Sequence, residues 1–307
     1  MAIADMIKKP TDPFRKDNIL CMIVGGNGIG KTRLAQSAPK PLLLDFENRI
    51  KDSGIIVADY VEQKYLRDYK TFKAESLNIA TLAKQYDTII VDTADELFNI
   101  IMNHLKQVKD YKNNMKLYGD ALNEMIDIMN NITLGIKNVV YLAHEKLLEY
   151  DGRIKRVPAV AGSFKQYFAS KSDLTGYMTV ETGRNKEVVR EIDFSNCAEF
   201  EGKCPLSTKH YVVPNIIAAN TFLADIFGDV YNFYNSMTSE QKAAAEEIEK
   251  IRTNLENVSS PSDIEMLVDS FASLDGAIKN QARAMLKARM KELGIKYNKD
   301  TKQYESN

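Results

Sequence analysis

Residues 25–32 read Gly25-Gly26-Asn27-Gly28-Ile29-Gly30-Lys31-Thr32. This stretch fits the pattern G-x-x-x-x-G-K-[ST] at every fixed position, which is typical of a loop that binds nucleotide phosphates. Glycines let backbone N–H groups turn inward around phosphate oxygens, and the helix that follows directs its partially positive N-terminus at the same oxygens. In this pattern Lys31 reaches the β- and γ-phosphates, and the Thr32 hydroxyl ligates Mg²⁺. We therefore expect all of these residues to form a nucleotide-binding loop.

The sequence on both sides of this loop alternates between short apolar runs and amphipathic segments. An apolar run at 19–24 precedes the loop, and a helical segment at 31–37 ends before Pro39 and Pro41. The same pattern continues downstream, with strands expected at 42–44, 88–91 and 139–142 and helices expected at 75–85, 94–110 and 119–134. Such alternation indicates a mostly parallel α/β sheet, and uninterrupted apolar strands indicate that helices cover both faces.

Beyond residue 145 the pattern changes. Two runs that flank Asp151-Gly152 predict a hairpin, and residues 174–193 predict two more strands around Gly183. The rest of the chain predicts helices, at 216–235, 239–257, 262–273 and 277–293. We therefore expect an α/β core over residues 1–210 and a C-terminal α-helical domain or extension over residues 211–307.

The composition is that of an ordinary folded protein. Hydrophobic residues make up 44% of the 307 residues, which excludes a disordered chain. The formal net charge of −1, from 41 Lys and Arg against 42 Asp and Glu, excludes a uniformly basic nucleic-acid coat. We find neither a membrane-spanning apolar run nor a secretory signal. The three cysteines lack zinc-site spacing, so we expect reduced thiols in a cytoplasmic protein without a membrane partner: Cys21, Cys197 and Cys204.

Asp92 ends the apolar strand at 88–91 and is the expected second ligand of Mg²⁺. Its alternative role is to cap the helix that starts near residue 94. A hydrolase also needs a carboxylate that orients or deprotonates water, and Thr93 stands where many P-loop ATPases place it. The candidates are Glu47, Asp95 and Glu96, of which the last two also fit the acidic preference of a helix's first turn.

The order of four segments resembles the core of RecA-type recombinases: the phosphate-binding loop, LLLDFE (42–47), TIIVD (88–92) and VVYLAHE (139–145). The similarity covers about residues 17–195 and is closest to the phage branch of ATP-binding single-strand-annealing proteins, which also share the Tyr118-Gly119-Asp120 segment. It implies a RecA-like P-loop NTPase core in which the fourth strand lies between the loop strand and the Asp92 strand. It also implies ATP and Mg²⁺ as cofactors.

The resemblance assigns catalytic roles to three residues. Glu47, in an aliphatic-Asp-x-Glu context, inherits the activation of water, and Lys31 binds the transferring phosphate. His144 lies 52 residues after Asp92, where RecA-like proteins carry a sensor of the γ-phosphate. A histidine at a strand end can equally be a hydrogen-bonded structural residue. The implied function is an ATPase that binds single-stranded DNA and assists phage DNA annealing or recombination.

Residues 151–171 combine a local charge balance of +4 with aromatic side chains. RecA-like proteins bind DNA through the loop after the sensor strand, and cations with aromatic faces suit single strands. The DNA-binding candidates are Arg153, Lys155, Arg156, Lys165 and Lys171, and the aromatic residues are Tyr150, Phe164, Tyr167 and Phe168. The alternative is a solvated hairpin followed by a helix whose aromatic side chains lie in the core.

The resemblance also implies a homo-oligomer, in which basic residues of the next hairpin reach the γ-phosphate of a neighbour. The candidates for such a trans-acting cation are Arg184, Lys186 and Arg190. A single-strand-binding protein is a further expected partner. In the C-terminal region, residues 240–275 have a charge balance of −6 and residues 279–302 have +6, which favours helices that pair with each other over a basic arm.

Two other functions share the nucleotide site. A nucleotide-regulated DNA-binding or loader protein would hydrolyse little ATP. A P-loop nucleotide kinase would need a lid with several arginines, and the sequence has no such cluster.

Overall fold

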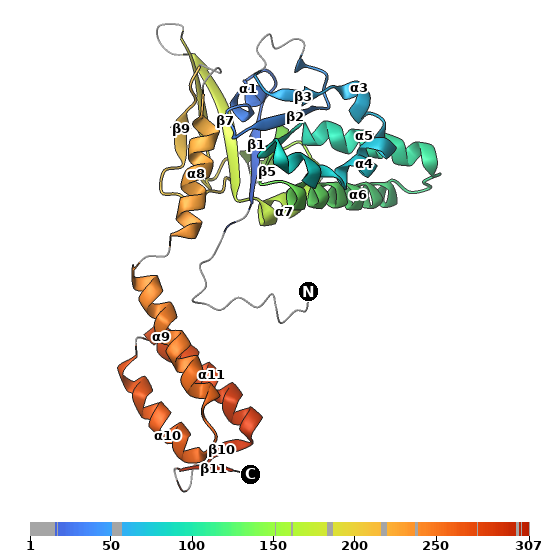
Figure 1. Ribbon diagram of the computed structural model, residues 1–307. Helices are drawn as coiled ribbons and strands as arrows, with labels where there is room; N and C mark the ends of the chain where they lie inside the picture. Colours follow the sequence, from blue (N-terminus) through green and yellow to red (C-terminus); the bar gives the residue numbers. More distant parts are fainter. Residues whose placement is uncertain are drawn as a thin grey trace. The chain divides into compact units, whose positions relative to one another are not determined.

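The computed structural model describes residues 16, 18–50, 57–150, 152–160, 162–182, 187–215, 220–236, 239–274, 276–298, 301 and 303–306. The chain forms two compact units (Figure 1). The larger unit runs from Lys16 to Phe233, and the smaller unit holds Tyr234–Asn307.

The larger unit is built on one sheet with the strand order β3-β2-β4-β5-β1-β7-β8-β9, and β6 pairs with β5. Its strands are β1 (Ile19–Gly25), β2 (Pro41–Asp45), β3 (Asp59–Val61), β4 (Thr88–Asp92), β5 (Asn138–Tyr150), β6 (Arg153–Pro158), β7 (Leu174–Thr182), β8 (Val188–Asp193) and β9 (His210–Val212). The neighbouring strands in the order β3-β2-β4-β5-β1-β7 all pair in parallel. The pairings β5–β6, β7–β8 and β8–β9 are antiparallel. The mostly parallel α/β sheet is confirmed, and β5 lies between β1 and β4 as the resemblance implies.

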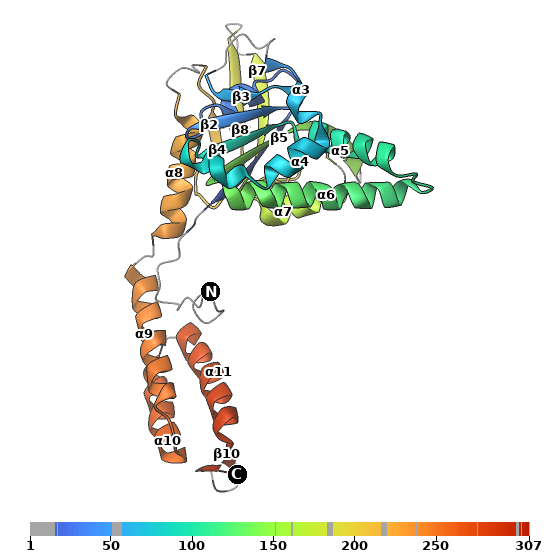
Figure 2. The same ribbon diagram turned by 45° about the vertical axis from the view of Figure 1, so that its right-hand side comes forward.

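Helices cover both faces of this sheet, which is why its central strands are apolar without alternation. The helices of the larger unit are α1 (Lys31–Ala35), α3 (Gln63–Leu66), α4 (Tyr69–Ser76), the 3₁₀ helix η2 (Ile79–Lys84), α5 (Ala94–Val108), α6 (Asn114–Gly135), α7 (Gly162–Lys171) and α8 (Phe222–Asn235). One apolar cluster joins Met22 of β1 and Tyr141 of β5 to side chains of α5, α6 and α7. Figures 1 and 2 show α6 and α8 on opposite sides of the sheet.

Several boundaries differ from the predicted ones. The helix expected at 119–134 begins earlier, at Asn114, because the Asn113 side chain accepts a hydrogen bond from the backbone N–H of Met115. The helix expected at 75–85 is the end of α4 followed by η2. The expected strand at 139–142 continues as β5 to Tyr150, and the predicted hairpin with β6 is confirmed. The two strands predicted around Gly183 are β7 and β8.

The larger unit extends beyond the boundary expected near residue 210, and this correction has a local cause. The backbone N–H of Leu223, at the start of α8, donates to Ser37 Oγ at 3.0 Å, and that of Ala224 donates to the Ser37 carbonyl at 3.1 Å. Tyr231 donates to the Lys137 carbonyl at 3.2 Å. These contacts hold α8 against the segment after α1 and the residue before β5, so α8 belongs to the core unit.

The smaller unit has its own apolar core, formed by residues such as Leu255, Ile264 and Leu286. Its elements are α9 (Ser239–Glu256), α10 (Pro261–Ser270), the 3₁₀ helix η3 (Phe271–Ser273), α11 (Gly276–Leu293), β10 (Ile295–Asn298) and β11 (Gln303–Ser306). The helices follow the predicted pattern, whereas the β10–β11 hairpin is an addition. Within the described part of the chain, no helix has the length and apolarity required to cross a membrane. All three cysteines are free thiols, and burial raises the pKa of Cys21 above its ordinary value.

Candidate nucleotide site

The loop between β1 and α1 is shaped by its glycines. Gly28 and Gly30 have φ angles of 71° and 105°, in the left-handed region that favours glycine. A Cβ at Gly25 would lie 2.3 Å from Ile29 Cδ1, so only glycine fits there without rearrangement. Lys31 Nζ donates to the carbonyls of Gly25 and Gly26 at 2.9 and 2.8 Å. Burial lowers the pKa of Lys31, against the influence of nearby carboxylates.

Thr32 and Asp92, the two residues expected to bind Mg²⁺, lie in direct contact. Thr32 Oγ1 donates to Asp92 Oδ2 at 2.6 Å, and the Asp92 residue is only 6% exposed. Burial raises the pKa of Asp92 to about 6. A hydroxyl and a carboxylate are the hard oxygen ligands that Mg²⁺ takes, and a cation there would offset a buried negative charge, so these residues fit Mg²⁺. The alternative role of Asp92 is excluded because Thr93 is the N-cap of α5.

Glu47 lies in the turn after β2 and lines the same cleft as Thr32 and Asp92. Its Oε1 accepts a hydrogen bond from Thr93 Oγ1 at 2.9 Å. Its Oε2 lies 3.1 Å from Arg49 Nε. The register between β2 and β4 places Asp45 opposite Asp92, so the turn that carries Glu47 begins beside Asp92. Glu47 is therefore positioned for the predicted role in activating water.

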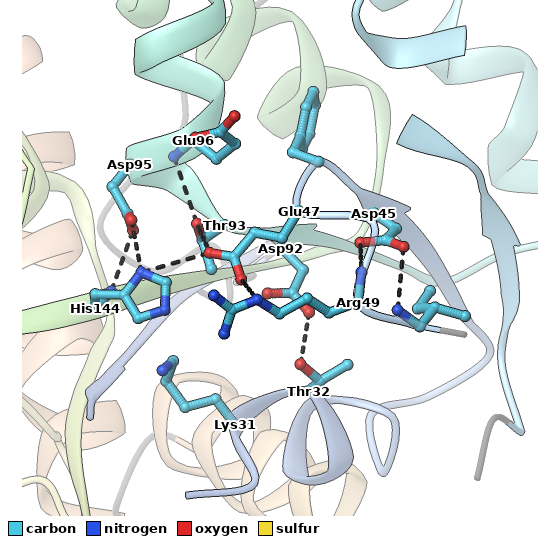
Figure 3. Close-up of polar contacts among 12 residues, drawn as sticks. Lys31, Thr32, Asp45, Glu47, Arg49, Asp92, Thr93, Asp95, Glu96 and His144 are labelled. Atoms are coloured by element: carbon cyan, nitrogen blue, oxygen red, sulfur yellow. Dashed lines mark hydrogen bonds and ion pairs between the residues drawn. The ribbon is translucent and has the colours of Figure 1, made fainter. Parts of the chain in front are cut away.

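His144 is held on β5 by Asp95, from the first turn of α5. His144 Nδ1 lies 2.7 Å from Asp95 Oδ2, and the backbone N–H of His144 donates to Asp95 Oδ1 at 3.1 Å. His144 Nδ1 is also 3.4 Å from Glu47 Oε1 (Figure 3). Burial acts to raise the pKa of Asp95, but its hydrogen bonds with His144 hold that pKa below the ordinary value. The three residues offer ligand atoms within 4.8 Å of one another, so they could also hold a metal ion.

These side chains line one cleft of about 360 Å³. It is lined by Gly28, Gly30, Lys31, Thr32, Arg33, Glu47, Arg49, Ile50, Asp92, Thr93 and His144. The fold thus brings together the predicted catalytic and metal-binding residues from the start of α1, the turn after β2, the end of β4 and the middle of β5. Arg49 lines the cleft without having been expected there from the sequence, although it stands only two positions after Glu47. Asp95 was expected either to activate water or to serve as an acidic residue of the first helix turn, and its contact with His144 was not anticipated.

Of the three candidates for a trans-acting cation, the structure describes only Arg190. Arg190, on β8, donates through Nε to the Ile29 carbonyl at 3.0 Å and through a terminal nitrogen to Asn215 Oδ1 at 3.1 Å. Arg190 is therefore bound to the phosphate loop of its own chain. Arg184 and Lys186 lie outside the described residues.

The segment 151–171 does not present its aromatic residues as a stacking surface, which corrects the expectation from composition. Phe164 and Phe168 are 0% and 2% exposed and belong to the core that α7 forms with the sheet. Tyr167 is partly buried against this core and donates to Asn130 Oδ1 at 2.6 Å. The core alternative is therefore the correct one for these three side chains.

The cations of this segment differ in how far they are bound to other residues of the chain. Arg156 donates through Nε to Glu145 Oε2 at 2.7 Å and through a terminal nitrogen to the Met178 carbonyl at 3.0 Å. Lys155 forms an ion pair with Glu201. Arg153 and Lys171 are exposed, and the Lys165 side chain lies outside the described part of the chain.

Comparisons with known proteins place this site in a family. Residues 17–206 match the AAA domain family. No curated protein matches the chain. Among solved structures, the chain is similar to an ATPase from the type III secretion system of pathogenic bacteria, at 11% identity over 93% of this chain and 84% of that chain, with a TM-score of 0.40.

Two further solved structures are similar over a smaller part of the chain. They are the flagellar accessory protein FlaH from Methanocaldococcus jannaschii (14% identity, 68% of this chain and 89% of that chain, TM-score 0.35) and a KaiC-like protein from Pyrococcus horikoshii OT3 (11%, 66% and 89%, TM-score 0.34). These similarities are too distant to bear on activity. The family match, in contrast, spans more than half of the chain and every residue that lines the cleft. The chain therefore belongs to the AAA domain family, and the sheet of its core has β5 between the phosphate-loop strand β1 and β4, the order that the resemblance to RecA-type proteins implies.

Proposed function

We propose that this protein is a Mg²⁺-dependent ATPase. The observation that supports this is the convergence of Lys31, the Thr32–Asp92 pair and Glu47 on one cleft of about 360 Å³. Phosphoryl transfer requires mainly positioning and electrostatic stabilisation, and these residues supply both. Mg²⁺, held by Thr32 and Asp92, would neutralise charge on the phosphate oxygens.

Glu47 would orient the attacking water and accept its proton, and His144 would contact the γ-phosphate. Asp95 occupies Nδ1 of His144, so Nε2 is the ring nitrogen that remains for the nucleotide. This arrangement fixes the ring and gives the sensor a defined orientation.

The test is phosphate release from Mg·ATP by the purified chain. In Glu47→Gln we expect the turnover rate to fall by at least about 100-fold, because general-base catalysis contributes 10²–10⁴-fold, while binding of an ATP analogue is kept. Glu96→Gln is the matched control, since Glu96 lies on the same helix turn as Asp95 and bonds to Asn99 instead. Unchanged turnover in Glu47→Gln would remove Glu47 from the mechanism.

We propose further that ATP turnover is coupled to single-stranded DNA, through the β5–β6 hairpin. In support, β5 carries His144 in the cleft and continues without interruption into this hairpin, where Arg153 is exposed. The resemblance to phage annealing proteins suggests a role in DNA annealing or recombination in the bacterial cytoplasm. We propose a homo-oligomer of this chain and a single-strand-binding protein as its partners in this role.

A second candidate is a nucleotide-regulated DNA-binding or loader protein that turns over little ATP. The ion pair between Glu47 and Arg49 favours it, since it occupies the carboxylate that would activate water. Phosphate release with and without single-stranded DNA separates these functions. DNA-stimulated release supports the ATPase, DNA binding with negligible release supports the loader, and release that requires a phosphate acceptor and ignores DNA indicates a nucleotide kinase.

A further inference from the structure

Arg49 is a cation in the nucleotide cleft that has no assigned role. Its side chain is 59% exposed and lines the cleft together with Lys31, Asp92 and His144. Figure 3 shows the side chain extending from the turn after β2 toward the middle of this group of residues. Arg49 forms an ion pair with Glu47, the proposed water-activating residue, at 3.1 Å between Nε and Oε2. Arg49 therefore lies where charge would develop on a transferring phosphoryl group.

The turn that carries Arg49 is built for this position. The buried Asp45 carboxylate accepts hydrogen bonds from the backbone N–H groups of Arg49 and Ile50, each at 3.3 Å. Asn48 has a φ of 60°, a left-handed conformation that asparagine tolerates better than most residues. The reversal after Asp45 thus directs two side chains, Glu47 and Arg49, into one cleft from a strand end that is itself fixed beside Asp92.

We propose that Arg49 is a catalytic residue that stabilises, from within the same chain, the negative charge on the γ-phosphoryl group during hydrolysis. This inference rests on the proposed ATPase function. In the step, the water oxygen forms a bond to the γ-phosphorus while the bond from that phosphorus to the β–γ bridging oxygen breaks. The bond's electron pair leaves with ADP, and a proton of the water passes to Glu47. The Arg49 guanidinium donates hydrogen bonds to the equatorial γ-oxygens and neutralises the negative charge that is spread over them in the transition state.

The ion pair with Glu47 also lets Arg49 couple nucleotide binding to the state of the catalytic carboxylate. A γ-phosphate carries more charge than a carboxylate and accepts forked hydrogen bonds from guanidinium, so it competes for Arg49 when nucleotide binds. Transfer of Arg49 from Glu47 to the phosphate would free Glu47 to hold water. Binding of the terminal phosphate would thus prepare the catalytic carboxylate.

The first test compares Arg49 variants of the full chain. Arginine fingers contribute about 10³–10⁵-fold to turnover, so we expect Arg49→Ala to lower kcat by at least about 100-fold with less than about threefold change in the Kd of an ATP analogue. Arg49→Lys keeps the charge but loses the planar fork, so its kcat should lie between those of Arg49→Ala and the unmodified protein. Arg67→Ala, which removes an exposed arginine next to α3, is the matched control and should retain turnover. Turnover of Arg49→Ala equal to or above that of an active unmodified protein overturns the proposal.

The second test asks whether Arg49 acts within its own chain. Arg49→Ala and Lys31→Ala chains are mixed, unfolded together and refolded, and phosphate release is measured. If Arg49 acted on a neighbouring subunit, the Lys31→Ala chain would supply it to the intact phosphate loop of the other chain and activity would return. We expect no recovery, and recovery would overturn the assignment within one chain. An unmodified protein that binds but never hydrolyses ATP would refute the ATPase function itself, which distinguishes that failure from a failure of Arg49 alone.

Discussion

The nucleotide cleft and the segment 151–171 both have sequence features of a functional site, yet the fold uses their side chains in opposite ways. In the cleft, Thr32 and Asp92, sixty positions apart, meet at 2.6 Å. Glu47, from the turn after β2, and His144, from β5, line the same cleft. In the segment 151–171, Arg156 is bound to Glu145 and Met178, and the Phe164 and Phe168 side chains are in the core.

The difference shows that a motif constrains where side chains lie in the fold, whereas a local composition does not. Polar residues that directly follow neighbouring parallel strands must meet at one sheet edge, so their positions along the chain constrain geometry. A count of cations and aromatic residues carries no such constraint, because the same arginine can neutralise a DNA phosphate or a buried glutamate. Substitutions in the two regions should therefore change different properties.

The largest expected effect comes from Asp92→Asn in the cleft. Loss of the carboxylate that would hold Mg²⁺ removes several kcal/mol of transition-state stabilisation, on the order of 10³-fold in kcat. Phosphate release measured against Mg²⁺ concentration checks this. A variant that retains turnover at ordinary Mg²⁺ concentrations would show that Asp92 is not a ligand.

The same variant should be more stable than the unmodified protein when no nucleotide or metal is present. The pKa of the buried Asp92 is raised from 3.8 to about 6, so its protonated form is favoured in the folded state. Its contribution to stability is therefore present below about pH 4 and is lost as the pH rises through about 6. At pH 7 we expect Asp92→Asn to increase the free energy of unfolding by about 1–3 kcal/mol, and we expect this difference to be smaller at pH 5, below the raised pKa of Asp92. Urea unfolding at pH 5 and pH 7 measures it, and a difference that grows at low pH would contradict it.

The sequence predicted the sheet and most of the cleft residues, because apolar runs mark the strands and the cleft residues stand in or directly after these runs. The roles of Arg49 and Asp95 were not anticipated, since each depends on a tertiary hydrogen bond. The Asp45 carboxylate shapes the turn that carries Arg49, and the position of α5 against β5 brings Asp95 to His144. The domain boundary was missed for the same reason, because only the contacts to Ser37 show that α8 belongs to the core.

One signal in the segment 151–171 was available in the sequence. Phe164 and Phe168 are four residues apart, which places them on one face of a helix, and such a pair is typical of a buried face. Ring centroids 4.9 Å apart at 80° confirm this packing. Helical spacing was therefore a better guide to these aromatic residues than their proximity to cations.

Arg156→Ala should mainly lower stability, because the Arg156 side chain is bound within the fold. Its side chain is 16% exposed, and the guanidinium lies 5.6 Å from the ring centroids of both Tyr177 and Phe200. Removal leaves the Glu145 carboxylate without this partner, and we expect the free energy of unfolding to fall by about 2–3 kcal/mol. Chemical denaturation of the full chain measures this. A loss below about 0.5 kcal/mol would mean that Arg156 is an ordinary surface residue and would reopen its assignment to DNA.

Arg153→Ala should have the smallest effect on stability and a selective effect on DNA. Arg153 is exposed near the turn of the β5–β6 hairpin, so its removal should change the free energy of unfolding by less than about 0.5 kcal/mol. A contact between this cation and one phosphate of a single strand releases counterions, and its loss should make the slope of log affinity against log salt concentration less steep by about 0.7. Titration of a labelled oligonucleotide at several salt concentrations measures the slope, and Arg67→Ala serves as the control for charge. An unchanged slope in Arg153→Ala would exclude this arginine from the interface, and the hairpin would then lose the cation on which its proposed role in DNA binding depends.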